Sequence, residues 1–224
     1  LDTLATELEG RLAKGEKLEQ AVKAILKATI KKHKRIIFNG NGYSDEWQKE
    51  AGKRGLLNHR TSVDAYSEAL KPDVVKAFEK YGVLNERELH ARYDVAVEQY
   101  NKTVNIEAQL MVLMTNRYIL PAAYRYQAQL GEAVAAVKAA GSTAKETKRS
   151  LDGIIRLTDD AKGRVDALQS LLEHEADGSA EKHAKYFRDK VIPAMNGLRE
   201  VGDQLEAICP HDLWPLPTYR EMLF

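Results

Sequence analysis

Apolar side chains recur every three or four residues along most of this chain, which is the spacing of one face of an α-helix. Two such runs cover residues 1–12 and 18–30, and residues 36–38 then predict a short buried extended piece. From residue 43 to 84 the runs are shorter, so we expect a compact set of short helices and turns. The predicted helix starts and stops in this stretch are Ser44, Gly55, Ser62, Pro72 and Gly82.

A much longer helix is predicted from residue 86 to 140. Asn85 and Glu88 form a capping-box pattern at its start, and Gly141 stands where it ends. Pro121 falls inside this stretch and should kink the helix, because proline removes one backbone donor and crowds the preceding turn.

Two heptad runs follow, joined by a tight turn at 177–179. Their steps of three and four predict an antiparallel hairpin with knobs-into-holes packing, and the long helix before them would complete a three-helix bundle. The apolar seam positions are Leu151, Ile154, Thr158, Ala161, Val165, Leu168 and Leu172 in the first run, and Ala184, Phe187, Val191, Ala194, Leu198, Val201, Leu205 and Ile208 in the second.

The sequence therefore predicts an all-α fold, with a short-helix base, a long antiparallel three-helix bundle containing a coiled-coil-like hairpin, and a Pro-rich docking tail. We expect three parts: residues 1–84 with short helices and turns, residues 85–209 as the bundle, and residues 210–224 as an extended tail. The tail is too rich in proline to continue a helix and too apolar to remain free, so we expect it to dock.

Charge and composition narrow the classes of function. The 224 residues carry 34 Lys and Arg against 33 Asp and Glu, a formal net charge of +1, which argues against binding to nucleic acid. No apolar run is long enough to span a bilayer, and the single cysteine, Cys209, excludes an intramolecular disulfide, so we expect a cytoplasmic protein without membrane contact. Because the chain begins at Leu1 inside an amphipathic pattern, we expect it to be a piece of a longer protein.

Two local patterns suggest anion or nucleic-acid binding, and both have simpler explanations. The Asn-Gly-Asn-Gly run at 39–42 lacks the Gly-Lys-Ser/Thr ending and the GxGxxG spacing of phosphate loops, so we favour a structural turn. The basic run Lys31–Arg35 lies at a predicted helix end, where cations offset the macrodipole.

The remaining candidate residues form no catalytic or metal-binding pattern. Cys209 ends a heptad run and fits a small core residue. Polar residues on the long helix should face solvent or a neighbouring subunit; the alternative is a buried network of Asn105, Glu107 and Arg117. These polar residues are Asn101, Lys102, Asn105, Glu107, Gln109, Asn116 and Arg117. The histidines, which lack HExxH or i, i+4 spacing and are expected at the surface, are His33, His59, His90, His174, His183 and His211. We therefore assign no catalytic, cofactor-binding or metal-binding residue.

Several stretches together resemble the C-terminal part of the bacterial type III glutamine synthetases. They are HKRIIFNGNGYSDEWQKEAGKRGL (33–56), KYGVLNERELHARY (80–93), EQYNKTVNIEAQ (98–109), ILPAAYRYQ (119–127) and LWPLPTYREMLF (213–224). The resemblance covers essentially the whole chain, in order. It implies a parent enzyme that uses ATP and Mg²⁺ or Mn²⁺ to join glutamate and ammonia into glutamine, releasing ADP and phosphate.

The resemblance places the parent's ATP-binding and metal-binding elements upstream of Leu1, so this chain alone is predicted to be inactive. The family carries an Asn-Gly-x-Gly-x-His signature, but Ser44 stands in the histidine position here, and we transfer no role to residues 39–44. The implied partners are the catalytic domain of the same polypeptide and further copies in a dodecamer of two hexameric rings. The region would then support fold and assembly. The alternative is a free-standing helical adaptor or coiled-coil scaffold without enzymatic activity.

Overall fold

The computed structural model describes residues 1–173, 178–217 and 219–223, and these residues contain helices and no strand. The predicted all-α class is therefore confirmed. The predicted tight turn at 177–179 lies partly outside the described residues. The chain divides into two compact units, Leu1–Arg60 and Thr61–Phe224, and each is described by itself.

The first unit consists of a helical pair followed by a loop and a short helix. Helices α1 (Asp2–Ala13) and α2 (Leu18–His33) pack together, and α3 (Asp45–Lys53) comes after the loop. The buried extended piece predicted at 36–38 is wrong, because a 3-10 turn covers Lys34–Ile36 and the side chains of Ile36 and Ile37 are exposed. The chain turns too soon after α2 for these isoleucines to reach a core.

The second unit begins with the predicted short helices, which are α4 (Ser62–Tyr66), the 3-10 turn η2 (Ser67–Leu70) and α5 (Pro72–Lys80). Pro72 occupies the predicted start of α5, but the cap of α4 is Thr61 instead of Ser62, since the Thr61 hydroxyl accepts the Asp64 N–H at 3.2 Å. These helices belong to the same compact unit as the long helices that follow. A domain boundary at residue 84 stays a prediction.

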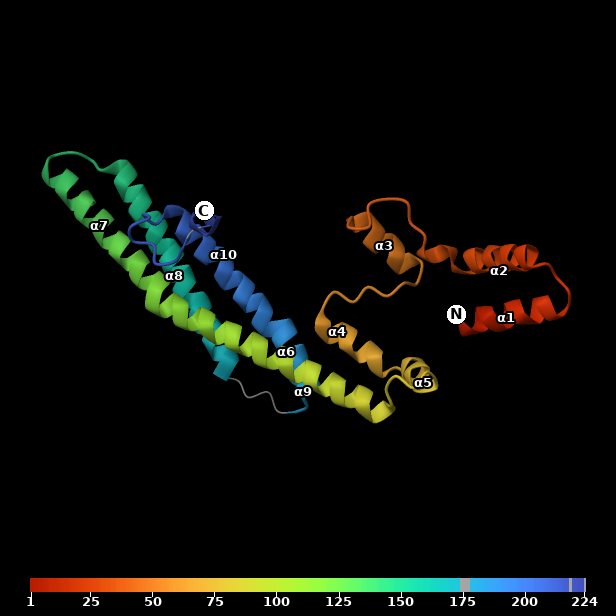
Figure 1. Ribbon diagram of the computed structural model, residues 1–224. Coiled ribbons are helices and arrows are strands. Elements are labelled where there is room, and N and C mark those ends of the chain that lie inside the picture. Colours follow the sequence, from red (N-terminus) through yellow and green to blue (C-terminus); the bar gives the residue numbers. More distant parts are fainter. Residues whose placement is uncertain (174–177, 218, 224) are drawn as a thin grey trace. The chain divides into compact units, whose positions relative to one another are not determined.

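The long helices follow one another up and down the second unit (Figure 1). Asn85 and Glu88 form the predicted capping box at the start of the first of them, since each side chain accepts a backbone N–H of the other. Their bounds are α6 Glu86–Met114, the π turn η3 Thr115–Ile119, α7 Leu120–Ala139, α8 Lys145–Glu173, α9 Ala180–Tyr186, the π turn η4 Phe187–Val191 and α10 Ile192–Ile208, with a last short helix, α11, at Tyr219–Leu223.

Helix α8 is the centre of the packing, because it contacts α6, α7 and α10. Most of the predicted seam is buried, and Ile208, at 41%, is the one described seam residue in the exposed class, while Leu151, Leu172, Phe187 and Ala194 are partly buried. The seam residues in the buried core are Ile154, Thr158, Ala161, Val165 and Leu168 on α8, with Ala184, Val191, Leu198, Val201 and Leu205 on the helices after it.

Polar side chains also join the helices to one another. The buried Thr158 hydroxyl donates to Ile154 O and accepts from Gln127 Nε2, both at 2.7 Å, which links α8 to α7. Arg164 on α8 donates to Gly197 O on α10 at 2.8 Å. The first of these bonds satisfies a buried hydroxyl, and together they link α8 to α7 and to α10.

Each proline inside the long helices follows a π turn. Pro121 comes after Thr115–Ile119, and Pro193 comes after Phe187–Val191. In an α-helix the proline ring clashes with the carbonyl four residues earlier, and the wider π turn moves that carbonyl away. Near Pro121, where a kink was predicted, the structure has a π turn just before the proline.

Candidate functional site

The Asn-Gly-Asn-Gly loop is a cap for the helix that follows it. Ser44 Oγ accepts the Trp47 N–H at 3.3 Å and donates to Asn41 O at 2.8 Å, as expected for the start of α3. The Asn41 side chain accepts the Tyr43 N–H at 3.0 Å. The oxygens of Asn41 and Ser44 are thus used to hold the turn, which agrees with a structural role for the loop.

An aromatic cluster lies under this loop. The Phe38 and Trp47 rings are stacked with centroids 4.4 Å apart, and the Arg54 guanidinium lies 5.4 Å from the Trp47 ring. Arg54 also donates to Arg35 O and Ile37 O, at 3.2 and 2.8 Å. Sequence reasoning missed this role of Arg54, because the two carbonyls that accept from it lie 19 and 17 residues earlier and no local pattern marks them.

Gly40 is the tightest point of this cluster, and Gly40→Ala tests it. An added Cβ would lie 2.5 Å from Phe38 Cζ, so the Phe38 ring must leave its stack on Trp47. We expect a loss of about 0.5–1.5 kcal/mol, the usual worth of an aromatic pair. Urea titration followed by Trp47 fluorescence in a Trp214→Phe background measures it.

The matched control is Gly42→Ala, two residues along the same loop. A Cβ at Gly42 meets no atom within 4 Å, so this variant should have the same free energy of unfolding as the unsubstituted chain. Equal stabilities of the two alanine variants would contradict the role given to Gly40.

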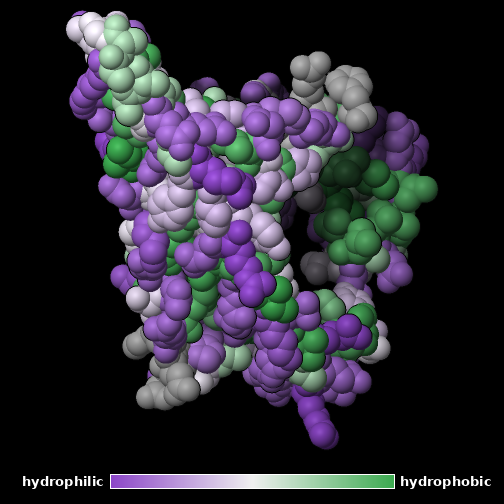
Figure 2. Space-filling view, turned by 90° about the vertical axis from the view of Figure 1, so that its left-hand side faces the viewer, coloured by the Kyte–Doolittle hydropathy of each residue, from purple (hydrophilic) through white to green (hydrophobic). Residues whose placement is uncertain are grey.

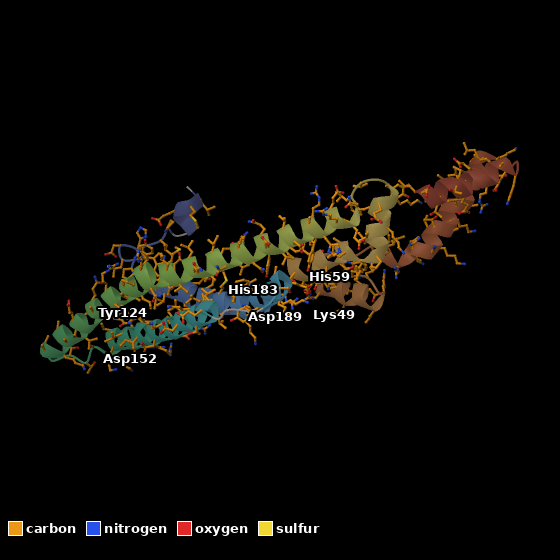
Figure 3. The ribbon with its side chains drawn as sticks, turned by 90° about the horizontal axis from the view of Figure 1, so that it is seen from below. Lys49, His59, Tyr124, Asp152, His183 and Asp189 are labelled. Carbon is orange, nitrogen blue, oxygen red and sulfur yellow. The ribbon has the colours of Figure 1, made fainter. Side chains whose placement is uncertain are left out.

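The basic residues and histidines do not gather into a site within the described residues. Lys31–Arg35 are all exposed at the end of α2, which fits the helix-end explanation. His33, His59, His90 and His211 are exposed as expected, while His174 lies outside the described residues. His183 on α9 (Figure 3) is partly buried, with its ring 6.4 Å from the ring of Phe187.

The side chains that the structure describes support neither metal binding nor a reactive thiol. There, no three His, Cys, Asp or Glu residues lie close enough to hold a metal ion. The Cys209 side chain is 8% exposed, and burial raises the pKa of its thiol, which disfavours a reactive thiolate. That this chain contributes no catalytic, cofactor or metal residue stays a prediction.

The polar residues of the long helix mostly face outward, as the first of the two interpretations expected. Glu107 and Arg117 are exposed, so the alternative of a buried network with Asn105 is wrong. Asn101, which is half-buried, differs from the rest because its Nδ2 donates to a distant backbone group, Ala180 O, at 2.8 Å. This bond ties α6 to the start of α9.

A second long-range tie joins the short helices to the long ones. Arg188 in the π turn η4 forms an ion pair with Asp64 on α4, and Asp64 also accepts from the Thr61 hydroxyl at 2.7 Å. Arg188 pairs with the neighbouring Asp189 at 2.7 Å as well, and this bond lowers the pKa of Asp189. Sequence reasoning missed the Asp64 pair, because its members are too far apart in sequence to leave a local pattern.

The Pro-rich tail docks on the helices of its own unit. Trp214 is 9% exposed and belongs to the same buried cluster as Leu198, Leu205 and Cys209, with Leu216 packed against it. The backbone N–H groups of Leu213 and Trp214 both donate to Pro210 O at 3.0 Å, which turns the chain back. The structure thus gives the tail a docking surface on its own unit, and the short helix α11 follows within it.

Large apolar side chains remain uncovered on both units. On α2, Leu18, Leu26 and Ile30 are 55–59% exposed, and α1 buries no residue at all. The outer face of α6 exposes Val95, Ile106, Leu110 and Leu113. On the face of the molecule in Figure 2, apolar patches emerge between hydrophilic side chains. None of the described helices combines the length and the apolar character needed to cross a bilayer.

Comparison with known proteins identifies the family. The family model described as the glutamine synthetase C-terminal domain matches residues 21–138, more than half of the chain. The chain is 29% identical to a glutamine synthetase of Butyrivibrio fibrisolvens over 94% of its length, and 30% identical to the type-3 glutamine synthetase of Dictyostelium discoideum over 92%. It is also 29% identical to a glutamine synthetase of Bacteroides fragilis over its whole length.

The match covers a minor part of each relative. The chain spans 30%, 29% and 32% of the length of these three proteins. Both the first unit and the long helices contribute, because the family model extends from α2 into the end of α7. This chain therefore belongs to the glutamine synthetase C-terminal domain family.

Proposed function

We propose that this chain is the C-terminal, non-catalytic part of a cytoplasmic type III glutamine synthetase, and that it supports the fold and the assembly of the parent enzyme. The parent reaction joins glutamate and ammonia at the expense of ATP, with Mg²⁺ or Mn²⁺ neutralising the transferred phosphoryl group. These ligands would be held by the rest of the polypeptide, since no residue of this chain is assigned to them.

The uncovered apolar surface of the first unit carries this proposal. Helices α1 and α2 form a pair in which only Ala21 and Ile25 are buried among the residues of the two helices. Burying an apolar side chain such as Leu26 or Ile30 is worth about 1.5–3 kcal/mol, so such a surface favours association with another protein surface. The catalytic domain of the same polypeptide is the proposed partner, within a dodecamer of two hexameric rings.

The surface can be tested in the full-length parent with Leu26→Gln and Ile30→Gln together. The double variant removes apolar contact without adding charge or breaking α2. We expect a smaller mass in solution by sedimentation or light scattering, together with reduced glutamine synthesis. The matched control is Lys27→Gln with Lys31→Gln, two exposed positions on the same helix, which should change neither. Unchanged mass together with unchanged glutamine synthesis of the apolar variant would refute the role of this face in fold and assembly.

A second test concerns the division of labour between this chain and the parent. The 224-residue chain should form no glutamine from glutamate, ammonia and ATP under conditions where the parent does. Measurable synthesis by the chain alone would overturn the non-catalytic assignment. The adaptor alternative shares this expected inactivity, but family membership favours the synthetase.

A further inference from the structure

Helix α6 carries apolar side chains on two opposite faces. Val97, Val104 and Ala108 are buried, and α8 and α10 contact the helix on that side (Figure 3). Each residue of an α-helix turns the chain by about 100°, so other apolar residues of α6 lie on the opposite face. These residues, which are 42–68% exposed, are Val95, Ile106, Leu110 and Leu113. We call this face, from Glu88 to Arg117, the outer stripe.

The outer stripe has the residue spacing of a coiled-coil seam. Ile106, Leu110 and Leu113 follow one another at steps of four and three, and Val95 precedes Ile106 by about three helical turns. A helix with large exposed apolar side chains at this spacing is stabilised when another helix covers them. The spacing therefore favours a helix as the occupant of this face.

The two halves of the outer stripe differ in shape. The first half contains a shallow groove that is open to solvent and is lined by Ala91, Val95 and Ala96, whose small side chains leave room between the turns. The second half protrudes, because Ile106 and Leu110 are large and at least half exposed. If α6 lies antiparallel to α6 of a second copy, each protruding half meets the groove of the other, and twofold symmetry forms the contact twice.

The charges along the outer stripe fit the same arrangement. Glu88 lies at its start and Arg117 at its end, and Arg117 has no acidic partner among the residues that the structure describes. An antiparallel pair with Leu110 beside Val95 of the second copy also sets Arg117 opposite Glu88, because both pairs are centred between residues 102 and 103. Lys102 lies near this centre, and its ion pair with Glu98 on the same helix, at 3.4 Å, offsets its charge.

We propose that two copies of this chain associate through an antiparallel contact between the outer stripes of their α6 helices, with Leu110 beside Val95 and Arg117 opposite Glu88. The stripe is about 44 Å long and about 10 Å wide, from the rise and diameter of an α-helix. Covering it on both copies removes roughly 900 Å² from solvent, the size of a weak, reversible interface. We therefore expect a dimer with a Kd in the micromolar range.

Sedimentation velocity of the 224-residue chain, between about 1 and 100 μM, measures this dimer. Ile106→Gln together with Leu110→Gln removes the protruding half and should raise the Kd at least about tenfold. The matched control makes the same two exchanges on α2, as Leu26→Gln with Ile30→Gln, and should leave the Kd unchanged. A chain that stays monomeric, or a dimer that the α6 variant does not weaken, would overturn the proposal.

The control also keeps this proposal separate from the role of α2 in the parent enzyme. If the α2 variant lowers the mass of the full-length parent while the 224-residue chain remains a monomer, the α6 contact is wrong and the proposed function is unaffected. If the chain forms a dimer through α6 and the α2 variant leaves the parent unchanged in mass and activity, the reverse holds.

Charge exchange tests the register. Arg117→Glu sets two carboxylates against each other and should raise the Kd at least about threefold, since the contact occurs twice. Adding Glu88→Lys should restore the dimer. This recovery cannot come from the capping box of α6, which the double variant lacks, and circular dichroism checks that its helices are intact. Failure of the second exchange to restore the dimer would refute this register.

Disulfide formation tests the direction of the two helices. In a Cys209→Ala background, chains with Val95→Cys mixed with chains with Leu110→Cys should form a disulfide-linked dimer of one chain of each kind. Val95→Cys alone should not cross-link, because the two copies of residue 95 lie about 22 Å apart in the antiparallel pair. A disulfide between two Val95→Cys chains would indicate parallel helices and contradict the proposal, as would a mixture that forms no disulfide.

Discussion

Replacing Trp214 with alanine lowers the free energy of unfolding of the second unit by about 3–5 kcal/mol, the usual cost of truncating a buried tryptophan. Trp214 is the residue through which the tail enters the buried cluster formed with Leu198, Leu205 and Cys209. Its removal exposes that cluster and releases Leu216, which packs against the same surface. Urea unfolding followed by far-ultraviolet circular dichroism measures the loss.

Two comparison variants distinguish the contribution of Trp214 to stability from that of the rest of the tail. Pro215→Ala changes the exposed residue next to Trp214, and its free energy of unfolding should stay within about 0.5 kcal/mol of that of the unsubstituted chain. Trp214→Phe keeps a ring in the cluster and sacrifices no hydrogen bond within the described residues, so it should cost much less than alanine. If Trp214→Ala were no more destabilising than Pro215→Ala, the tail would not be anchored by this side chain.

The long helices could be predicted because their signal is local. Steps of three and four place Ile154, Ala161, Val165 and Leu168 on one face, and all four are buried in the structure. The capping box at Asn85 was predictable for the same reason, since its two members lie within one turn. The all-α class follows from these local patterns without knowledge of any partner.

Features that depend on distant residues could not be predicted. The spacing of Ile36 and Ile37 indicated a buried strand-like piece, but burial needs a surface to pack against, and among the described residues of the first unit both side chains are exposed. The ion pair of Arg188 with Asp64 joins residues that are 124 positions apart in the sequence. The spacing of apolar residues along the chain carries no information about such a contact.

In the candidate site, too, local features could be predicted and features that depend on distant residues could not. The sequence indicated that the tail should dock, because it is too rich in proline to continue a helix and too apolar to remain free, and it correctly favoured a capping turn at Ser44. It could not place the open pocket beside the tail, because Met111, Gly202 and Trp214, which line it, come from three separate segments. A pocket is what packing leaves unfilled, and no single segment encodes it.

The π turn before Pro121 changes which residues of the long helix face the core. Val97 and Thr115 are both buried and lie five full turns apart at 3.6 residues per turn. Five further turns would bring residue 133 to the same face, but Ala133 is exposed and Val134 is buried instead. One extra residue is therefore accommodated between Thr115 and Val134, which is what a π turn does to an α-helix.

Deleting Arg117 from this turn should therefore keep Val134 on the core face and convert the turn to ordinary α-helix. The cost should come from Pro121, which would then lie inside an unbroken helix, and we expect a loss of about 3 kcal/mol in urea unfolding. The same deletion combined with Pro121→Ala should recover most of that loss, because alanine restores the donor and removes the clash. Deleting Asp159 from the regular helix α8 is the control, since it rotates Val165 and Leu168 away from the core and should abolish cooperative unfolding. If Pro121→Ala gave no recovery, the π turn would serve something other than the proline and the register of the helix.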